Sequence, residues 1–305
     1  MNKQSLSITN KNIDYPLVSF IISSYNYENF IEQTLNSIKN QTYKNFEIII
    51  VDDFSSDNSV SVIQNYINNN SNLDIQFIKH DKNYGQLKSI LTGLTIANGD
   101  FISFIDSDDV LNEQYAEILL KVHKKINTGF VSCKAKEIKK TEENLIKTDK
   151  NKFSDYTKLK DLKNKPFGGW FWYPMSSAMF KKSAVEIILK YQNTDEWKIC
   201  PDKFIFNFVN LIEGSVLIDI NLFYKRKHEN NAGNFNRTKL NIENNKKIRK
   251  LTLKFIKQNI NELILKYNKN NILKYIAKIY LSYFYIPVQI LKYVTKTLTS
   301  KIRTD

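Results

Sequence analysis

The chain has 305 residues, a formal net charge of +14 and 42% hydrophobic residues. This length allows one sizeable core with appendages, and the charge fits polyanionic partners such as nucleic acid, anionic lipid or diphosphates. Only Cys133 and Cys200 are present, which excludes a disulfide-rich scaffold. Three scattered histidines do not indicate a zinc site. The polar start and the lack of eighteen consecutive apolar residues predict a cytoplasmic protein without a spanning helix.

Strand and helix patterns alternate up to about residue 138, which predicts an α/β fold with a largely parallel sheet. Short apolar runs indicate strands, and apolar residues at helical spacing indicate helices. The expected strands are 17–22, 46–51, 74–79 and 100–105, and the expected helices are 27–40, 58–69, 86–97 and 111–126.

The second half of the chain is less regular. Residues 139–165 are polar and form either an excursion or a mobile loop. The aromatic run 167–174, with Trp170 and Trp172, forms either a pocket wall or packed core. A helix at 202–211 and strands at 215–220 and 222–224 are expected after it.

Polar residues in 272–297 recur at near-helical spacing and leave a broad apolar face, which predicts a basic amphipathic helix kinked at Pro287. Helices of this kind lie in the interface of anionic membranes. The alternative is a helix that packs on the rest of the protein or on a second copy.

Acidic residues follow two of the expected strands. Asp106, Asp108 and Asp109 place three carboxylates in four positions, and Asp52 and Asp53 follow the strand at 46–51. Carboxylates this close repel one another and are best tolerated around a divalent cation, which keeps positions for phosphate oxygens. Ligands of open α/β sheets bind at the carboxyl ends of the strands. The acids therefore predict one metal-diphosphate or nucleotide site.

Other phosphate-binding signatures are absent from the sequence. It contains no Gly-x-Gly-x-x-Gly and no Gly-x-x-x-x-Gly-Lys-Ser/Thr, so a dinucleotide enzyme or a P-loop ATPase has little support. A phosphoacceptor receiver domain would leave most of the chain unexplained.

Four segments together resemble the family-2 glycosyltransferases with a GT-A fold: 18–26, 31–41, 51–57 and 85–109. The resemblance covers residues 16–125 and continues more weakly to about 235. It implies a Rossmann-like, mostly parallel sheet flanked by helices in a catalytic domain, 1–235, with a nucleotide-sugar half at 16–125 and an acceptor half at 126–235. A basic helical extension at 236–305 follows.

The same resemblance assigns roles to individual residues. Ser23 and Tyr25 match positions that line the nucleotide pocket, and Asp53, with Asp52 beside it, matches the acid that hydrogen-bonds uracil. Asp106 and Asp108 match the motif that meets the ribose and a divalent cation, manganese or magnesium. For Asp52 and Asp57 the alternative is a turn or a helix N-cap.

The catalytic base implied by the resemblance is Asp202, at the start of the expected helix 202–211. A carboxylate there could equally be a charge favoured by the helix dipole. Asp195 and Glu196 are the fallback candidates. A base has to lie within reach of the acceptor hydroxyl.

Two stretches of the sequence concern contacts to the donor diphosphate. Many family members carry Arg-Asn where this chain has Ile90 and Leu91, so Lys88 is the candidate basic contact. Arg226 and His228 match a late stretch that closes over the diphosphate, with a solvated basic loop as the alternative.

The resulting hypothesis is an inverting transferase that moves a sugar from a nucleotide-diphosphate donor, UDP by the match of Asp53, to a glycan or lipid-linked acceptor. The product would be a surface polysaccharide or glycolipid, made on the inner face of the plasma membrane. A non-catalytic nucleotide-sugar or membrane-binding scaffold is the alternative. A nucleic-acid binder ranks third, and no nucleic-acid partner is expected.

Overall fold

The computed structural model describes residues 15–139, 159–161, 174–191, 201–228, 254–259, 261 and 263. Several predictions lie outside these ranges. They are the aromatic run up to Tyr173, the acids Asp195 and Glu196, Cys200, and the tail helix at 272–297.

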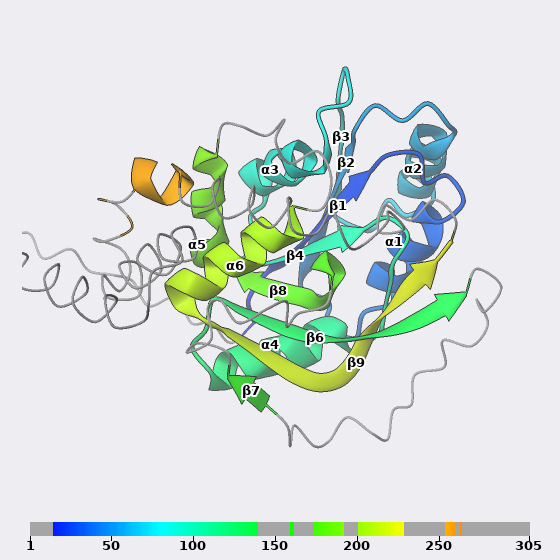
Figure 1. Ribbon diagram of the computed structural model, residues 1–305. Helices are drawn as coiled ribbons and strands as arrows, with labels where there is room; N and C mark the ends of the chain where they lie inside the picture. Colours follow the sequence, from blue (N-terminus) through cyan, green and yellow to red (C-terminus); the bar gives the residue numbers. More distant parts are fainter. Residues whose placement is uncertain are drawn as a thin grey trace, which may run out of the picture.

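A parallel sheet with helical crossovers forms the first half of the described chain, as predicted (Figure 1). Its strands lie in the order β3-β2-β1-β4, and each neighbouring pair is parallel. The elements are β1 (Val18–Ser24), α1 (Ile31–Lys39), β2 (Phe46–Asp52), α2 (Ser59–Asn69), β3 (Ile75–Lys79), α3 (Gln86–Ile96) and β4 (Phe101–Asp106).

The second half extends the sheet with mixed pairing, in the order β4-β8-β6-β9-β5. β8 is antiparallel to both β4 and β6, while β6 and β9 are parallel. Its elements are β5 (Val110–Leu111), α4 (Tyr115–Lys125), β6 (Phe130–Lys139), β7 (Leu159–Asp161), the 3₁₀ turn η3 (Met175–Ser177), β8 (Ala178–Lys181), α5 (Lys182–Val185), the 3₁₀ turn η4 (Glu186–Lys190), α6 (Asp202–Glu213) and β9 (Ser215–Lys227).

Three predicted boundaries in this half are wrong. The helix expected from residue 111 begins at Tyr115, because Val110 and Leu111 pair as β5 with β9. The two late strands are one continuous strand, β9, which pairs with β5, β6 and β7 along its length. The irregular segment expected at 139–165 contains strand residues at two places: Lys139 ends β6, where it pairs with Lys227, and Leu159–Asp161 form β7.

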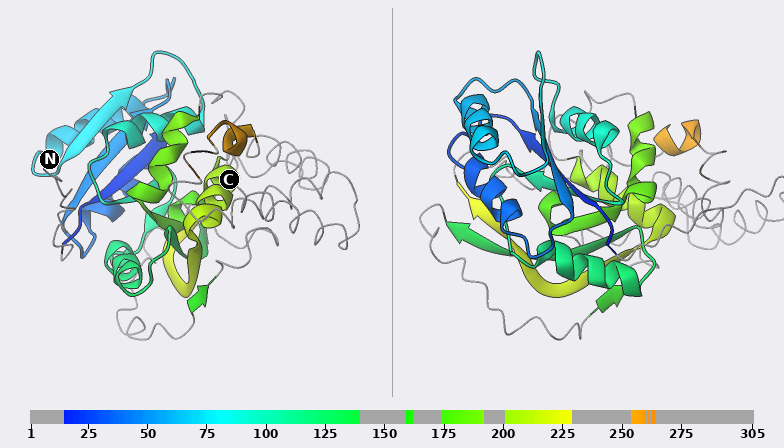
Figure 2. Two further views of the ribbon diagram at one scale, coloured as in Figure 1. Left: turned by 90° about the vertical axis from the view of Figure 1, so that its left-hand side faces the viewer. Right: turned by 180° about the vertical axis from the view of Figure 1, so that it is seen from behind.

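Helices cover both faces of the sheet, so the domain has three layers (Figure 2). Alternate residues of β1 point to opposite faces. Phe20 and Ile22 pack with α1, α2 and α4, whereas Ile21 packs with α3 and α6. The two buried clusters fix the sheet between its helices, and the carboxyl ends of the parallel strands lie together at one edge. No helix in the described part of the chain is long and apolar enough to cross a membrane.

Gly93 allows α3 to approach the sheet closely. A Cβ atom built there would lie 2.4 Å from Cγ2 of Ile21, a buried residue of β1. Overpacking of this kind costs about 1–3 kcal/mol. We therefore expect Gly93→Ala to lower the free energy of unfolding by about that amount in urea denaturation. A change below about 0.5 kcal/mol would contradict the close packing of α3 against β1.

Candidate active site at the carboxyl edge of the sheet

The strand register brings the predicted acids to one edge. In the three central strands, Ser24 of β1 is paired with Asp52 of β2, and Ser23 is paired with Asp106 of β4. The hydroxyl of Ser107 donates to the carbonyl of Ser23 at 2.9 Å, which ties the acidic turn after β4 to β1. The predicted convergence of two acidic strand ends is therefore confirmed.

Asp106, Asp108 and Asp109 form a largely buried acidic cluster. Asp108 and Asp109 are 6% and 2% exposed. Burial, with added repulsion from Asp108 and Asp202, raises the pKa of Asp106 to about 7. Burial and the charges of Asp108 and Asp106 hold the pKa of Asp109 well above its usual range. These shifts mean that the cluster carries more negative charge than its protein surroundings stabilise.

Two side chains stabilise the cluster by hydrogen bonds. Gln86, the first residue of α3, donates from Nε2 to Asp106 Oδ1 at 2.9 Å. Ser176, in η3, accepts from the backbone N–H of Asp106 at 3.0 Å, and its hydroxyl also bonds the Asp109 carboxylate. The sequence did not predict either residue, because neither lies in an acidic or basic run.

The end of β9 packs against α1 and the acidic turn. His228 Nε2 lies 2.9 Å from Asp108 Oδ2, and its ring stacks on Phe30 with centroids 4.7 Å apart. Arg226 is 1% exposed; its Nε donates to the backbone carbonyl of Asp108, and its guanidinium also bonds Gln33 and lies over Phe30. Arg226 thus supports the turn that carries Asp108, and the predicted contact of Arg226 with a donor stays a prediction.

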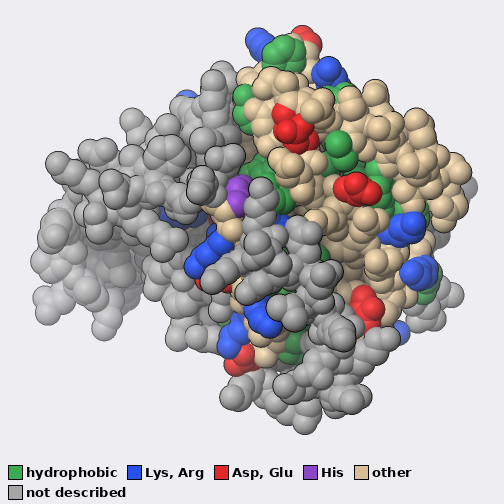
Figure 3. All heavy atoms as spheres, turned by 90° about the vertical axis from the view of Figure 1, so that its right-hand side faces the viewer, with side chains coloured by type: hydrophobic (Ala, Val, Ile, Leu, Met, Phe, Trp, Pro, Cys, Tyr) green, Lys and Arg blue, Asp and Glu red, His purple; other side chains and the backbone are tan. Residues whose placement is uncertain are grey.

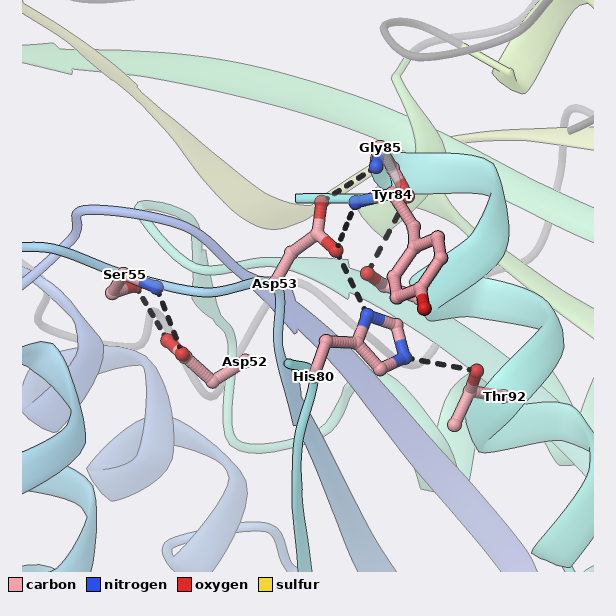
Figure 4. A network of polar contacts seen from close by, with 8 residues as sticks. Asp52, Asp53, Ser55, His80, Tyr84, Gly85 and Thr92 are labelled. Carbon is pink, nitrogen blue, oxygen red and sulfur yellow. Dashed lines mark hydrogen bonds and ion pairs between the residues drawn. The ribbon is translucent and has the colours of Figure 1, made fainter. Parts of the chain in front are cut away.

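Asp53 is 2% exposed and lies within a network of polar contacts (Figure 4). Its Oδ1 accepts the backbone N–H of Tyr84 at 2.9 Å and lies 2.8 Å from His80 Nδ1, and its Oδ2 accepts the N–H of Gly85 at 2.7 Å. His80 Nε2 lies 3.1 Å from the hydroxyl of Thr92.

Gly85 has a φ of 89°, a left-handed conformation that suits glycine. Asp53 therefore fixes the loop between β3 and α3. One of its four carboxylate acceptor sites remains beyond the three contacts in Figure 4. The predicted uracil contact requires that site and stays a prediction.

We expect Asp53→Asn to destabilise the protein by about 2–4 kcal/mol, because an amide cannot accept from three donors at once and hydrogen bonds to charged groups are strong. Urea denaturation measures the loss, with the exposed Asp74→Asn as control. Unchanged stability together with lost nucleotide binding would show that Asp53 acts on the ligand and not on the loop.

The other predicted acids near β2 make turn contacts. Asp52 is fully buried and accepts from the backbone N–H of Ser55 at 3.0 Å and from its hydroxyl. Asp57 accepts from the N–H of Ser59, the first residue of α2, at 2.9 Å. The structural interpretation of both residues, a turn and a helix start, is confirmed. A nucleotide contact by Asp52 stays a prediction.

Two predicted nucleotide contacts lie at the rim of this edge. Tyr25 follows β1 and is 45% exposed, and Lys88 lies in the first turn of α3, partly exposed. Phe54, which the sequence analysis did not single out, is 49% exposed at a φ of 69°. Non-glycine residues in this strained conformation are uncommon and tend to occur near functional sites.

Asp202 is the first residue of α6, and its partly exposed carboxylate accepts the N–H of Lys203 at 2.9 Å. Burial raises its pKa, and Lys225 acts in the opposite direction. The charge of Asp202 also raises the pKa of Asp106, so the predicted base lies within electrostatic reach of the acidic cluster. Lys225 acts on Asp106, Asp109 and Asp202 alike and was not predicted as a site residue. Its only signal was its position in the basic stretch that ends β9.

A buried acidic turn after β4, a second acidic strand end beside it and an acid at the start of α6 therefore share one edge of the sheet. The sequence profile described as "Glycosyl transferase family 2" matches residues 19–189, more than half of the chain. The chain belongs to glycosyl transferase family 2. This confirms the family expected from the sequence.

Curated proteins similar to this family-2 chain carry glycosyltransferase names. It is 31% identical over 175 residues, 56% of this chain and 53% of the relative, to "GalNAc(5)-diNAcBac-PP-undecaprenol beta-1,3-glucosyltransferase" of Campylobacter jejuni. It is 35% identical over 118 residues, 39% of this chain and 45% of the relative, to "UDP-Glc:alpha-D-GlcNAc-diphosphoundecaprenol beta-1,3-glucosyltransferase WfgD" of Escherichia coli. The chain spans at most about half the length of these relatives.

Solved structures share the GT-A fold with this family-2 chain. TarS 1-349 of S. aureus in complex with UDP superimposes with a TM-score of 0.59 at 17% identity, over 88% of this chain and 72% of that one. Mannosyltransferase PcManGT of Pyrobaculum calidifontis, in complex with GDP-Man and Mn2+, gives 0.53 at 15% identity, over 93% of this chain and 80% of that one. The predicted fold class is confirmed.

Proposed function

We propose that the protein is a metal-dependent inverting glycosyltransferase that moves a sugar from a nucleotide-diphosphate donor to a hydroxyl of a glycan or lipid-linked acceptor. The observation that carries the proposal is the shared edge: the acidic turn of Asp106 and Asp108, aligned in register with Ser23 and Asp52, lies within electrostatic reach of Asp202. The candidate nucleotide site, metal ligands and base could thus act together on one donor and one acceptor.

A divalent cation, manganese or magnesium, fits Asp108 and Asp106, and His228 would orient the Asp108 carboxylate through its contact with Oδ2. The raised pKa values of Asp106 and Asp109 support this, since a cation would offset the burial and the mutual repulsion that raise them. Among the described residues no group of three or more acids, histidines or cysteines has the arrangement of a complete metal cage. Such cations are commonly held by one or two carboxylates plus substrate phosphates. When bound, the cation would offset charge on the leaving diphosphate.

The donor would occupy the edge between β1, β2 and α3. Ser23, Tyr25, Asp52 and Asp53 would meet the nucleoside, and Asp106 the ribose. Lys88 would supply the basic contact to the diphosphate. At the position where many family members carry arginine, this chain has Ile90, whose apolar side chain is buried. UDP is the proposed nucleotide, supported by the UDP complex of TarS and by the donor named for WfgD.

Asp202 would take the proton of the acceptor hydroxyl while that oxygen attacks the anomeric carbon from the face opposite the diphosphate. This in-line displacement inverts the anomeric configuration. The base needs to be ionised and close to the hydroxyl, and a carboxylate at the start of a helix is favoured by the helix dipole.

Further parts of the proposal concern the whole chain. Residues 1–235 would form the catalytic domain and 236–305 a basic extension that binds the inner face of the plasma membrane. The relatives named for undecaprenol-linked acceptors support a lipid-linked acceptor and a role in surface polysaccharide synthesis. Co-sedimentation of the full chain with anionic but not with zwitterionic vesicles is the expected result.

The test of the function is transfer from UDP-glucose, UDP-galactose, UDP-N-acetylglucosamine and GDP-mannose to a synthetic sugar-diphosphate lipid, with manganese, magnesium or chelator. One donor should be consumed only with metal, and NMR should show the inverted anomer in the product. Donor binding without turnover would favour the non-catalytic scaffold. The proposal would be overturned if the protein neither bound nor consumed any of these donors.

A further inference from the structure

The acidic turn after β4 is held by side chains from two distant elements, α1 and β9. Three consecutive carbonyls of the turn, those of Ser107, Asp108 and Asp109, accept hydrogen bonds from side chains. The hydroxyl of Thr34 lies 2.8 Å from the carbonyl oxygens of both Ser107 and Asp109. Between them, the carbonyl of Asp108 accepts from Arg226 Nε at 3.3 Å. The backbone of the proposed metal ligand Asp108 is therefore fixed at its own carbonyl and on both sides.

Thr34 lies in α1 and is fully buried. A threonine inside a helix often bonds the carbonyl four residues before it. Here that carbonyl, of Phe30, lies 3.5 Å from the hydroxyl, whereas the two turn carbonyls lie at 2.8 Å. A hydroxyl has one hydrogen to donate, so its proton is shared between the two closer acceptors. The hydroxyl of Thr34 thus serves the acidic turn more than its own helix.

Two other residues on this face of α1 hold the side chains that reach Asp108 from β9. They lie four residues and one residue before Thr34, within the spacing of one helix face. The ring of Phe30 stacks on His228, whose Nε2 bonds the Asp108 carboxylate. Gln33 accepts from the guanidinium of Arg226. One face of α1 therefore fixes the turn directly and the Asp108 carboxylate through the end of β9.

The carboxylates of the acidic turn are covered. Asp108 and Asp109 are buried. Figure 3 looks onto the side of the molecule that carries α1 and α2, where the acidic side chains of described residues are scattered singly. Because little solvent reaches the turn, its protein neighbours decide how its carboxylates are oriented.

We propose that Thr34 is a positioning residue for the metal site, and that α1 thereby sets the affinity of the site for its cation. Partners that orient a metal ligand without touching the metal change metal affinity by about 10–100-fold when they are removed. Loss of the Thr34 hydroxyl would leave two buried carbonyls without this donor and allow the turn that carries Asp108 to shift. The inference rests on the proposed function, because it concerns the cation that would hold the donor diphosphate.

Manganese binding by the full chain tests this role without any need for turnover. The loss of the EPR signal of free Mn²⁺ is titrated with UDP present, since phosphate oxygens fill the positions that carboxylates leave open. Thr34→Val keeps the branched shape but has no hydroxyl, and should weaken manganese binding about 10–100-fold. Thr34→Ser keeps the hydroxyl and should bind manganese nearly as tightly as wild type. Thr34→Ala provides the same comparison if the valine variant does not fold.

Ser19→Ala is the control for a general loss of stability. The Ser19 hydroxyl is also fully buried and joins two elements, donating to Glu47 Oε1 at 2.6 Å and accepting from the N–H of Gly99 at 2.9 Å. It lies near the amino end of β1, whereas the acidic turn is at the carboxyl edge of the sheet. Both Ser19→Ala and Thr34→Val should lower the midpoint of urea unfolding. Ser19→Ala should nevertheless keep the wild-type affinity for manganese.

In transfer assays, Thr34→Val should raise the manganese concentration for half-maximal activity, while kcat at saturating manganese stays near wild type. A wild-type manganese affinity in Thr34→Val would overturn the inference, as would an equal loss in Ser19→Ala or no recovery in Thr34→Ser. If wild type binds no manganese, both the proposed cation and the role of Thr34 fail. If manganese binding depends on Thr34 but no donor is consumed, the positioning role stands and the proposed function fails.

Discussion

Asp108→Asn is expected to reduce metal-dependent sugar transfer by about 10³-fold or more in kcat/KM. Asp108 lies 6% exposed in the acidic turn, and His228 Nε2 bonds its carboxylate. The amide keeps the size of the side chain but removes the charge that a hard cation requires. The loss should therefore appear first as a higher manganese concentration for half-maximal activity, and saturating metal should restore only part of the rate.

The control separates this effect from general damage. Asp74→Asn changes an exposed acid just before β3 and should keep wild-type activity and metal dependence. Asp108→Asn should remain folded, because it reduces repulsion within a cluster whose carboxyl pKa values are raised. Wild-type activity of Asp108→Asn with wild-type metal dependence would show that the cation, if used, binds elsewhere.

The sequence predicted the parallel half of the fold well because each of its elements carries a local signal. Residues 46–51, for instance, are apolar except for Glu47, and the structure has β2 at Phe46–Asp52. The second half was harder because its strands are defined by distant partners. The β5 strand exists only through its pairing with Tyr224 and Phe223, and β8 is placed between β4 and β6 by antiparallel contacts.

The same distinction applies to the site. The carboxylates were predictable from the runs after two strands, because those runs are contiguous in sequence. Their partners were not: His228 and Asp108 are 120 positions apart, and Ser176 and Asp106 are 70 apart. His80 was dismissed as a metal ligand from histidine spacing, but no spacing argument could show that it bonds Asp53. Contacts of this kind depend on tertiary packing.

Asp202→Asn is expected to reduce kcat for transfer by about 10²–10⁴-fold. Donor binding and the KM for the donor should stay near the wild-type values. An amide cannot accept the proton of the acceptor hydroxyl, yet it keeps the shape of the helix start. Glu213→Gln, at the opposite end of α6, is the matched control and should retain activity. Near-wild-type kcat in Asp202→Asn would identify another group as the base.

The pH dependence gives an independent check of the same residue. Burial raises the pKa of Asp202, so its ionised fraction, and with it kcat, should rise with pH through that raised pKa. The stability effect has the opposite sign. A carboxyl with a raised folded-state pKa binds protons more tightly than the unfolded chain does, so its ionisation costs stability as pH rises from the unfolded value through the folded one.

Asp202→Asn removes that cost. At neutral pH the midpoint of urea unfolding of the variant should therefore be no lower than that of wild type. The variant should nevertheless have lost transfer activity, and its residual kcat should no longer rise with pH through the pKa of Asp202. Lost activity with preserved stability is the combination expected of a base held ionised at some expense to the fold. Lost activity with lowered stability would instead indicate that the Asp202 carboxylate mainly supports the start of α6.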